Sequence, residues 1–166
     1  MATRLQPPPD DRYLTDPDAW ALEQAALLRA RRFGELDLEN LAEEVEDLGR
    51  RKADELESRY ATLLQHLLEW EFHPARRFNS WAGTIGRSRR KIVEHVDDNP
   101  GLKSRRVELF SKTYPDGRDD AAIETNLPRE HFPAENPYTL EQVMDEDFWP
   151  GGREMPDHET TKRRRR

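Results

Sequence analysis

Residues 37–74 read DLENLAEEVEDLGRRKADELESRYATLLQHLLEWEFHP, and this stretch decides the fold. Asp37 is suited to capping a helix, whereas Pro74 ends one because proline has no N–H to donate to the carbonyl of Trp70. Between them the apolar residues recur every three or four positions, as on one face of an α-helix: Leu38, Leu41, Val45, Leu48, Leu56, Tyr60, Leu63, Leu67 and Trp70. The sequence therefore predicts one long helix over about 37–73.

Helix boundary signals also flank this stretch. Asp16 and Pro17 open an earlier helix, and Gly34 is expected to end it in the left-handed conformation. After the long helix, Ser80 is expected to cap a helix that carries Trp81 and stops at Asn99-Pro100. These signals predict a succession of helices and no strand.

The C-terminal third continues in the same way. One helix is expected to run from Leu102 to Tyr114, and another from Pro115 to Leu127-Pro128. Thr139-Leu-Glu-Gln142 has the spacing of a capping box, which predicts a short last helix. Phe148-Trp149-Pro150 is expected to anchor the end of the chain to the helices.

The composition agrees with helices that have narrow apolar stripes. Of the 166 residues, 34% are hydrophobic and 37% are charged, which suits amphipathic helices better than a sheet buried on both faces. The predicted fold is all-α: a single-domain helical bundle over 13–150, after a flexible N-terminal lead over 1–12 and before a disordered basic tail over 151–166.

The charge distribution bears on location and partners. The formal charge is −7, but all of residues 162–166 are basic, so the rest of the chain is more acidic than this value. An acidic body repels nucleic acid and anionic membranes. The absence of cysteine excludes disulfides, thiolate zinc sites and cysteine nucleophiles. No signal peptide or membrane span is evident, so we expect a cytoplasmic protein that does not enter the membrane.

Several segments, taken in order and with their spacing, resemble a known family. They are Tyr13-Leu-Thr-Asp16 with Trp20, residues 36–46, His66-Leu-Leu-Glu-Trp70, Arg77, Ser80-Trp81, Asn99-Pro-Gly-Leu102, Glu124-Thr125 and residues 138–142. Residues 13–150 are similar to the bacterial family catalogued as domain of unknown function twenty-nine. The resemblance implies an all-helical fold, and it implies no activity.

The stretch from His66 to Trp81 gathers most of the residues with chemical potential. His66, Glu69 and His73 lie on one side of the predicted helix, where they could bind zinc or ferrous iron with help from Glu94 and His95. The usual short ligand spacings are absent, and a hydrogen-bonded histidine in the core is the more ordinary outcome. We therefore predict neither a metal nor a cofactor.

A basic cluster surrounds Trp81, formed by Arg76, Arg77, Arg87, Arg89, Arg90 and Lys91. Arginine beside an aromatic ring can bind a phosphate or a stacked base. The alternative is that these side chains pair with the acids of residues 39–47 or are simply solvated. The direction in which the arginines turn therefore decides between a ligand surface and a structural role.

A second set of charges is acidic, formed by Glu39, Glu43, Glu46 and Asp47, with Asp120 and Glu124 on a later helix. Carboxylates spaced in this way on two helices could hold magnesium and a nucleotide phosphate. A solvated acidic face is the more ordinary interpretation. No Gly-x-Ser-x-Gly motif or glycine-rich phosphate loop accompanies them.

The sequence by itself does not identify a function, and it predicts no catalytic residue. The favoured hypothesis is a helical binding or regulatory module that recognises an unknown protein partner or an anionic ligand; nucleic acid as the partner has no specific support, and the oligomeric state is open. The alternative is a magnesium-dependent phosphohydrolase-type enzyme that uses carboxylates on its helices. The residues predicted to bind the ligand are His66, Trp70, Arg76, Arg77, Trp81, Arg87 and Arg90.

Overall fold

The structure is a computed structural model that describes residues 12–154. These residues form α-helices, short 3-10 helices and loops, with no strand among them, so the all-α prediction is confirmed. Their contacts divide the described chain into two compact units, which meet between Arg51 and Lys52. The expectation of one helical domain over 13–150 stays a prediction. The expected N-terminal lead lies, apart from residue 12, outside the described residues.

The first unit contains α1 (Arg12–Thr15), α2 (Pro17–Arg29), the 3-10 helix η1 (Phe33–Glu35) and the first part of α3 (Leu38–Phe72). The predicted start of α2 is confirmed, because the side chain of Asp16 accepts a hydrogen bond from Ala19 N at 3.1 Å. The expected end at Gly34 is wrong. The residue with left-handed backbone is Arg31, at φ 57°, directly after the cap of α2.

Asp37 holds α2 and the start of α3 together. Its carboxylate accepts a hydrogen bond from Trp20 Nε1 at 3.2 Å, and its backbone N–H donates to Gln24 Oε1 at 2.9 Å. The same carboxylate accepts from the backbone N–H of Asn40, as expected of a helix cap. Trp20 and Gln24 are the buried residues of α2.

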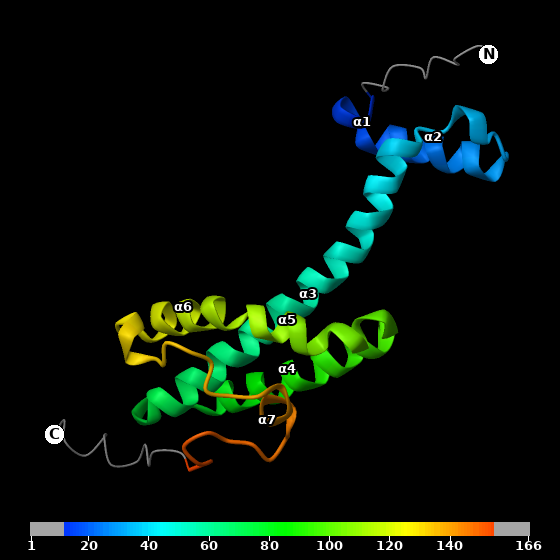
Figure 1. Ribbon diagram of the computed structural model, residues 1–166. Helices are drawn as coiled ribbons and strands as arrows, with labels where there is room; N and C mark the ends of the chain where they lie inside the picture. The colour runs from blue at the N-terminus through cyan, green and yellow to red at the C-terminus, as the bar shows by residue number, and fades with distance from the viewer. Residues whose placement is uncertain (1–11, 155–166) are drawn as a thin grey trace. The chain divides into compact units, whose positions relative to one another are not determined.

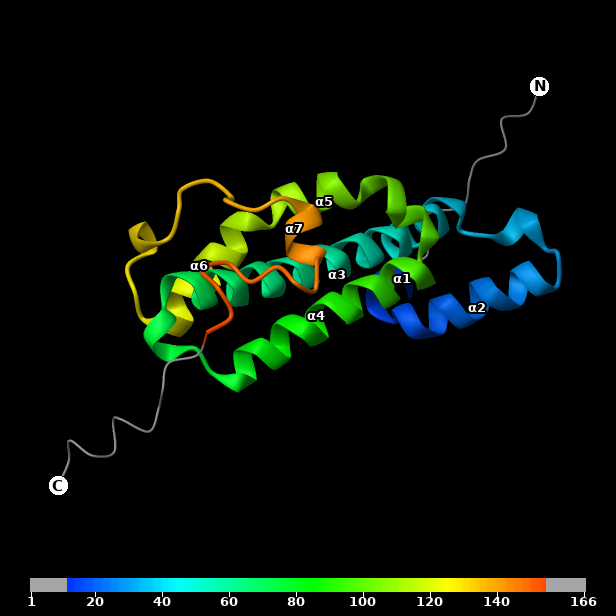
Figure 2. The same cartoon turned by 90° about the horizontal axis from the view of Figure 1, so that it is seen from below.

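The second unit is built around the rest of α3. The stripe predicted from Leu56 to Trp70 is fully buried there and supplies most of the core. Figures 1 and 2 show α4 (Asn79–Asp98) on one side of this helix and α5 (Arg106–Lys112) with α6 (Tyr114–Thr125) on another. The core therefore lies along a helix that the sequence predicted closely, about 37–73 against Leu38–Phe72.

The turn between α3 and α4 differs from the prediction in one detail. Pro74 does end α3, and it begins the 3-10 helix η2 (Pro74–Arg76). α4 ends before Asn99-Pro100, as predicted, but its N-cap residue is Phe78, with no side-chain capping hydrogen bond, so the expected cap at Ser80 is wrong. The first-turn N–H groups of α4 consequently have no side-chain cap.

The segment after α4 is less regular than predicted. The helix expected from Leu102 to Tyr114 is divided into the 3-10 helix η3 (Pro100–Arg105) and α5. The last helix, α7 (Leu140–Met144), has the predicted capping box between Thr139 and Gln142.

Residues 128–154 return across the second unit, and we call them the C-terminal strap. The strap holds only the 3-10 helix η4 (Arg129–His131) and α7 as helical structure. Its Phe148 and Trp149 pack against the core, as the sequence predicted. Disorder beyond the strap stays a prediction, because residues 155–166 lie outside the described part of the chain.

α6 approaches α3 closely at Gly117. A Cβ atom on Gly117 would lie 2.8 Å from the carbonyl oxygen of Ala61 and 3.0 Å from Leu64 Cβ. Backbone atoms of a helix cannot move aside as a flexible side chain can. Gly117 is therefore the residue that sets the distance between these two helices.

We expect Gly117→Ala to lower the free energy of unfolding by about 1–3 kcal/mol, because the added methyl group overpacks the α3–α6 contact. Chemical denaturation measures this change. Gly86→Ala is the matched control, since a Cβ atom there meets only the flexible end of Arg90 at 3.7 Å. Alanine at that position should leave stability unchanged or raise it by about 0.5–1 kcal/mol. Equal losses in both variants would contradict the packing argument.

Candidate functional site

Trp70 lies in the core at the C-terminal end of α3. Its side chain is fully buried, its Nε1 donates to the carbonyl oxygen of Gly152 at 2.8 Å, and its ring lies 4.8 Å from that of Trp149. The indole therefore joins α3 to the strap and offers no free face to a ligand.

Arg77, the residue after η2, turns inward. Its Nε donates to the carbonyl oxygen of Trp70 at 2.8 Å, and its two terminal nitrogens donate to those of Glu154 and Gly151 at 2.9 and 3.0 Å. The guanidinium also lies over the Trp70 ring. Gly151 has φ +67°, and a Cβ atom there would lie 2.8 Å from Arg77 Nη2, so this contact depends on glycine.

Arg89 makes the equivalent contact from the middle of α4. It is 3% exposed, and its three nitrogens donate to the carbonyl oxygens of Val143, Phe148 and Glu146 at 2.8, 2.8 and 3.2 Å. Burial lowers the pKa of the Arg89 guanidinium below its ordinary value. A third buried arginine, Arg118 of α6, donates to the carbonyl oxygen of Phe132 at 2.8 Å.

Among the described residues, the buried arginines therefore neither face solvent, where a ligand would bind, nor form ion pairs with acidic side chains. Arg77, Arg89 and Arg118 turn inward, but toward backbone carbonyl oxygens of the strap and the end of α3. This structural role of the arginines was not predicted from the sequence. One feature of the sequence could have indicated it: the segment after Pro128 is long and has little helical periodicity. The backbone carbonyl groups of such a segment need hydrogen-bond donors from elsewhere in the protein.

We expect Arg89→Met to lower the free energy of unfolding by about 2–4 kcal/mol, because it leaves buried carbonyl oxygens without donors. Arg90→Met is the matched control: Arg90 is adjacent and exposed, so its loss should change stability by no more than about 0.5 kcal/mol. Denaturant titration of both variants measures the difference. Indistinguishable stabilities would show that the Arg89 hydrogen bonds contribute nothing net.

His66 is bonded to a buried carboxylate. Its Nδ1 lies 2.7 Å from Glu69 Oε2, and Gln65 Nε2 donates to Glu69 Oε1 at 2.8 Å. Glu69 is fully buried, so His66 and Gln65 satisfy a carboxylate that burial would otherwise destabilise. His66 therefore forms its hydrogen bond with Glu69 of the same helix.

The candidate metal ligands do not form a metal site within the described residues, although His66 and Glu69 are in contact. No group of three or more His, Cys, Asp or Glu side chains within residues 12–154 is arranged to hold a metal ion. His95 Nε2 donates instead to the carbonyl oxygen of Lys52 at 2.8 Å. The Nδ1 atom of His73 is buried with no hydrogen-bond partner in the described part of the chain.

The surroundings of His73 disfavour its charged form. Desolvation lowers the pKa of His73 below its ordinary value of 6.5, and the charges of Arg76 and His131 lower it further, against a weaker opposite effect of Glu69. The folded protein therefore holds this imidazole neutral where an unfolded chain would protonate it.

This difference predicts a pH dependence of stability. As the pH falls below about 6.5, the unfolded chain takes up a proton at His73 before the folded chain does, so the free energy of unfolding decreases. We expect His73→Gln to lose less stability than the parent protein between pH 7.5 and pH 5.5, measured by urea denaturation at both values. A parent and variant with the same loss would contradict the assignment.

Four cations of the same region point to solvent: Arg76, Arg87, Arg90 and Lys91, which we call the basic face. None of the four has a carboxylate within ion-pair distance among the described residues. The sequence explains why, since residues 72–93 contain no Asp or Glu. Trp81 lies half-buried nearby, with its ring 5.6 Å from that of Phe78.

The arginines of the basic face lie along the helix surface. A terminal nitrogen of Arg87 lies over Gly83, 3.4 Å from where a Cβ atom of that residue would be. A terminal nitrogen of Arg90 lies over Gly86 in the same way, at 3.7 Å. Arg87 also donates to Thr84 Oγ1 at 3.0 Å. Their guanidinium groups therefore extend toward the uncapped N-terminal turn of α4, where the backbone dipole adds positive potential.

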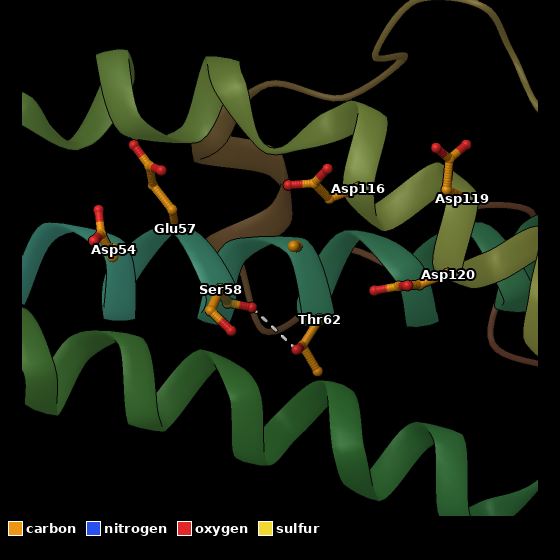
Figure 3. A pocket seen from close by; sticks show the side chains of 8 residues that line it. Asp54, Glu57, Ser58, Thr62, Asp116, Asp119 and Asp120 are labelled. Carbon is orange, nitrogen blue, oxygen red and sulfur yellow. Dashed lines mark hydrogen bonds between the residues drawn. The ribbon is translucent and has the colours of Figure 1, made fainter. Parts of the chain in front are cut away.

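An acidic pocket lies between α3 and α6, on a different side of α3 from α4 (Figure 3). Asp54 and Glu57 line it from α3, and Asp116, Asp119 and Asp120 from α6. Asp119 bonds to Arg129, and Figure 3 shows its carboxylate directed away from α3. Of the acids predicted from the sequence, Asp120 lines this pocket.

Burial separates the arginines of this all-helical chain into a structural set and an exposed set. A comparison with family models matches residues 12–149 to the family described as Domain of unknown function DUF29, and the chain belongs to that family. No curated protein and no solved structure matches the chain. No helix within residues 12–154 is long and apolar enough to span a membrane.

Proposed function

We propose that this chain is a binding module that recognises an anionic partner through the basic face. The observation that supports the proposal is that Arg76, Arg87, Arg90 and Lys91 are exposed and lack carboxylate partners in the described chain. An exposed guanidinium without a partner can form bidentate hydrogen bonds to a phosphate or carboxylate group. The cytoplasmic location expected from the sequence belongs to the same proposal.

The basic face differs from several other exposed cations of the second unit, because those cations are paired with acids. Lys103 pairs with Asp97, Arg105 and Lys112 pair with Glu108, and Arg129 pairs with Asp119. Exposed ion pairs of this kind neutralise the local field, so they leave little attraction for a distant anion. The basic face forms no such ion pair among the described residues, so more of its positive charge is available to attract an anion.

Of the seven residues predicted to bind a ligand, the proposal keeps Arg76, Trp81, Arg87 and Arg90 and adds Lys91. Trp70 and Arg77 are buried and bonded to the strap, and His66 is bonded to Glu69. Trp81 borders the basic face and offers a partly exposed ring that can pack against an apolar part of the partner.

The magnesium-dependent phosphohydrolase is less well supported. The acidic pocket has several carboxylates, but within residues 12–154 they form no group able to hold a metal ion. One of them, Asp119, is already paired with Arg129. A magnesium-dependent phosphohydrolase needs its metal ions to neutralise the charge of its substrate, and a pocket lined by carboxylates alone repels phosphate.

Binding of inorganic tripolyphosphate and of a hexaglutamate peptide, measured by calorimetry at low and moderate salt, tests the proposal. We expect the parent protein to bind at least one of them with an affinity that falls as salt rises. The double variant Arg87→Gln/Arg90→Gln should lose about tenfold or more in affinity, equivalent to about 1.4 kcal/mol. The far-ultraviolet circular dichroism spectrum should not change.

The matched control is Lys103→Gln/Arg105→Gln, which removes the same charge from cations that are already paired. This control should bind almost as the parent protein does. Absence of salt-sensitive binding tighter than about 100 μM for both probes would overturn the proposal. An equal loss in the control would show that only net charge matters.

A further inference from the structure

The first unit leaves much of its apolar surface uncovered. On α3, Leu38 is 61% exposed, Val45 is 68% exposed and Leu48 is 60% exposed. Within the described residues 12–51, Trp20 is the buried large apolar side chain. A surface of this kind usually marks an interface.

The exposed residues form a regular strip. Leu38, Leu41, Val45 and Leu48 are separated by three, four and three positions, which is the spacing of the core seam of a two-helix coiled coil. Leu41 is partly buried, and the small residues Ala42 and Gly49 border the strip and are exposed. Small residues at the border allow a second helix to approach closely.

The charges beside the strip change sign along the helix. Residues 37–47 contain six acids and no base: Asp37, Glu39, Glu43, Glu44, Glu46 and Asp47. Residues 50–52 are Arg-Arg-Lys. A second copy running antiparallel would bring the basic end of each helix beside the acidic end of the other, whereas a parallel copy would bring like charges together.

We propose that the strip of residues 38–48 is a self-association surface, on which a second copy of this chain packs antiparallel through the same strip. The interface has two-fold symmetry, so each copy supplies both the acidic and the basic end. Arg50 pairs with Asp47 and Arg51 with Glu44 within one chain, but the two arginine side chains are exposed and can exchange partners at small cost.

Analytical ultracentrifugation of the full chain tests the proposal first. We expect a monomer–dimer equilibrium that weakens as salt rises, and a monomer for the variant Val45→Glu/Leu48→Glu at concentrations where the parent is dimeric. The control is Val107→Glu/Ile123→Glu, which changes exposed apolar residues of the second unit in the same way and should stay dimeric. A parent chain that is monomeric up to about 1 mM overturns the proposal.

A charge exchange tests the antiparallel arrangement of charges. The variants Glu39→Lys/Glu43→Lys/Glu46→Lys and Arg50→Glu/Arg51→Glu each remove the complementarity, so each alone should be monomeric. An equimolar mixture should restore the dimer, because each basic segment then faces an acidic one. A mixture that stays monomeric, with both variants folded by circular dichroism, would overturn the proposal.

Cysteine crosslinking tests the direction of the helices, since the natural chain has no cysteine. In an antiparallel pair of these strips, Leu41 of one copy lies opposite Val45 of the other, so a mixture of Leu41→Cys and Val45→Cys should form a disulfide between copies under mild oxidation. Leu38→Cys by itself should not, because the two ends lie too far apart. Efficient crosslinking of Leu38→Cys by itself indicates a parallel pair and would overturn the proposed arrangement.

Discussion

The second unit depends on hydrogen bonds between buried guanidinium groups and backbone carbonyl oxygens. The strap, residues 128–154, has little helical structure of its own, so its carbonyl groups lack the partners that a helix would provide. Arg77 and Arg89 supply three donors each to carbonyl oxygens, and Arg118 supplies one. The fork of a guanidinium suits this task, because it presents several N–H groups in a fixed plane.

Other side chains reinforce the same arrangement. Trp70 donates to Gly152, and Tyr114 donates to the carbonyl oxygen of Pro133 at 2.7 Å. Tyr138 donates to Glu71, and burial together with this bond raises the pKa of Tyr138 far above its ordinary value. The helices α3, α4 and α6 therefore hold the strap through polar side chains as well as apolar packing. The described hydrogen bonds that hold the strap do not involve the exposed arginines of the basic face.

The sequence predicted the helices well, because their signals are local. The apolar spacing gave α3 almost to the residue, and Pro74, Asn99 and the Thr139 capping box gave true boundaries. It failed at Gly34 and Ser80, because more than one residue near each of these boundaries could end or cap the helix. It could not separate Arg89 from Arg90, because the difference depends on where residues 143–148 lie in space.

The candidate site shows the same limit. Counting arginines around Trp81 predicts one basic cluster there, yet the residues that are buried and those that are exposed alternate within it. The missing information is long-range: Arg77 contacts residues more than seventy positions away, and Arg89 contacts residues more than fifty positions away. Helical spacing alone does not encode such pairings.

The exchange of arginine Nε–H protons with water, measured by NMR, tests the central claim most directly. The Nε atoms of Arg77 and Arg89 donate to the buried carbonyl oxygens of Trp70 and Val143. We predict that these two Nε–H signals exchange far more slowly than those of Arg87 and Arg90, which are exposed. Exchange of all four at the same fast rate would contradict the account.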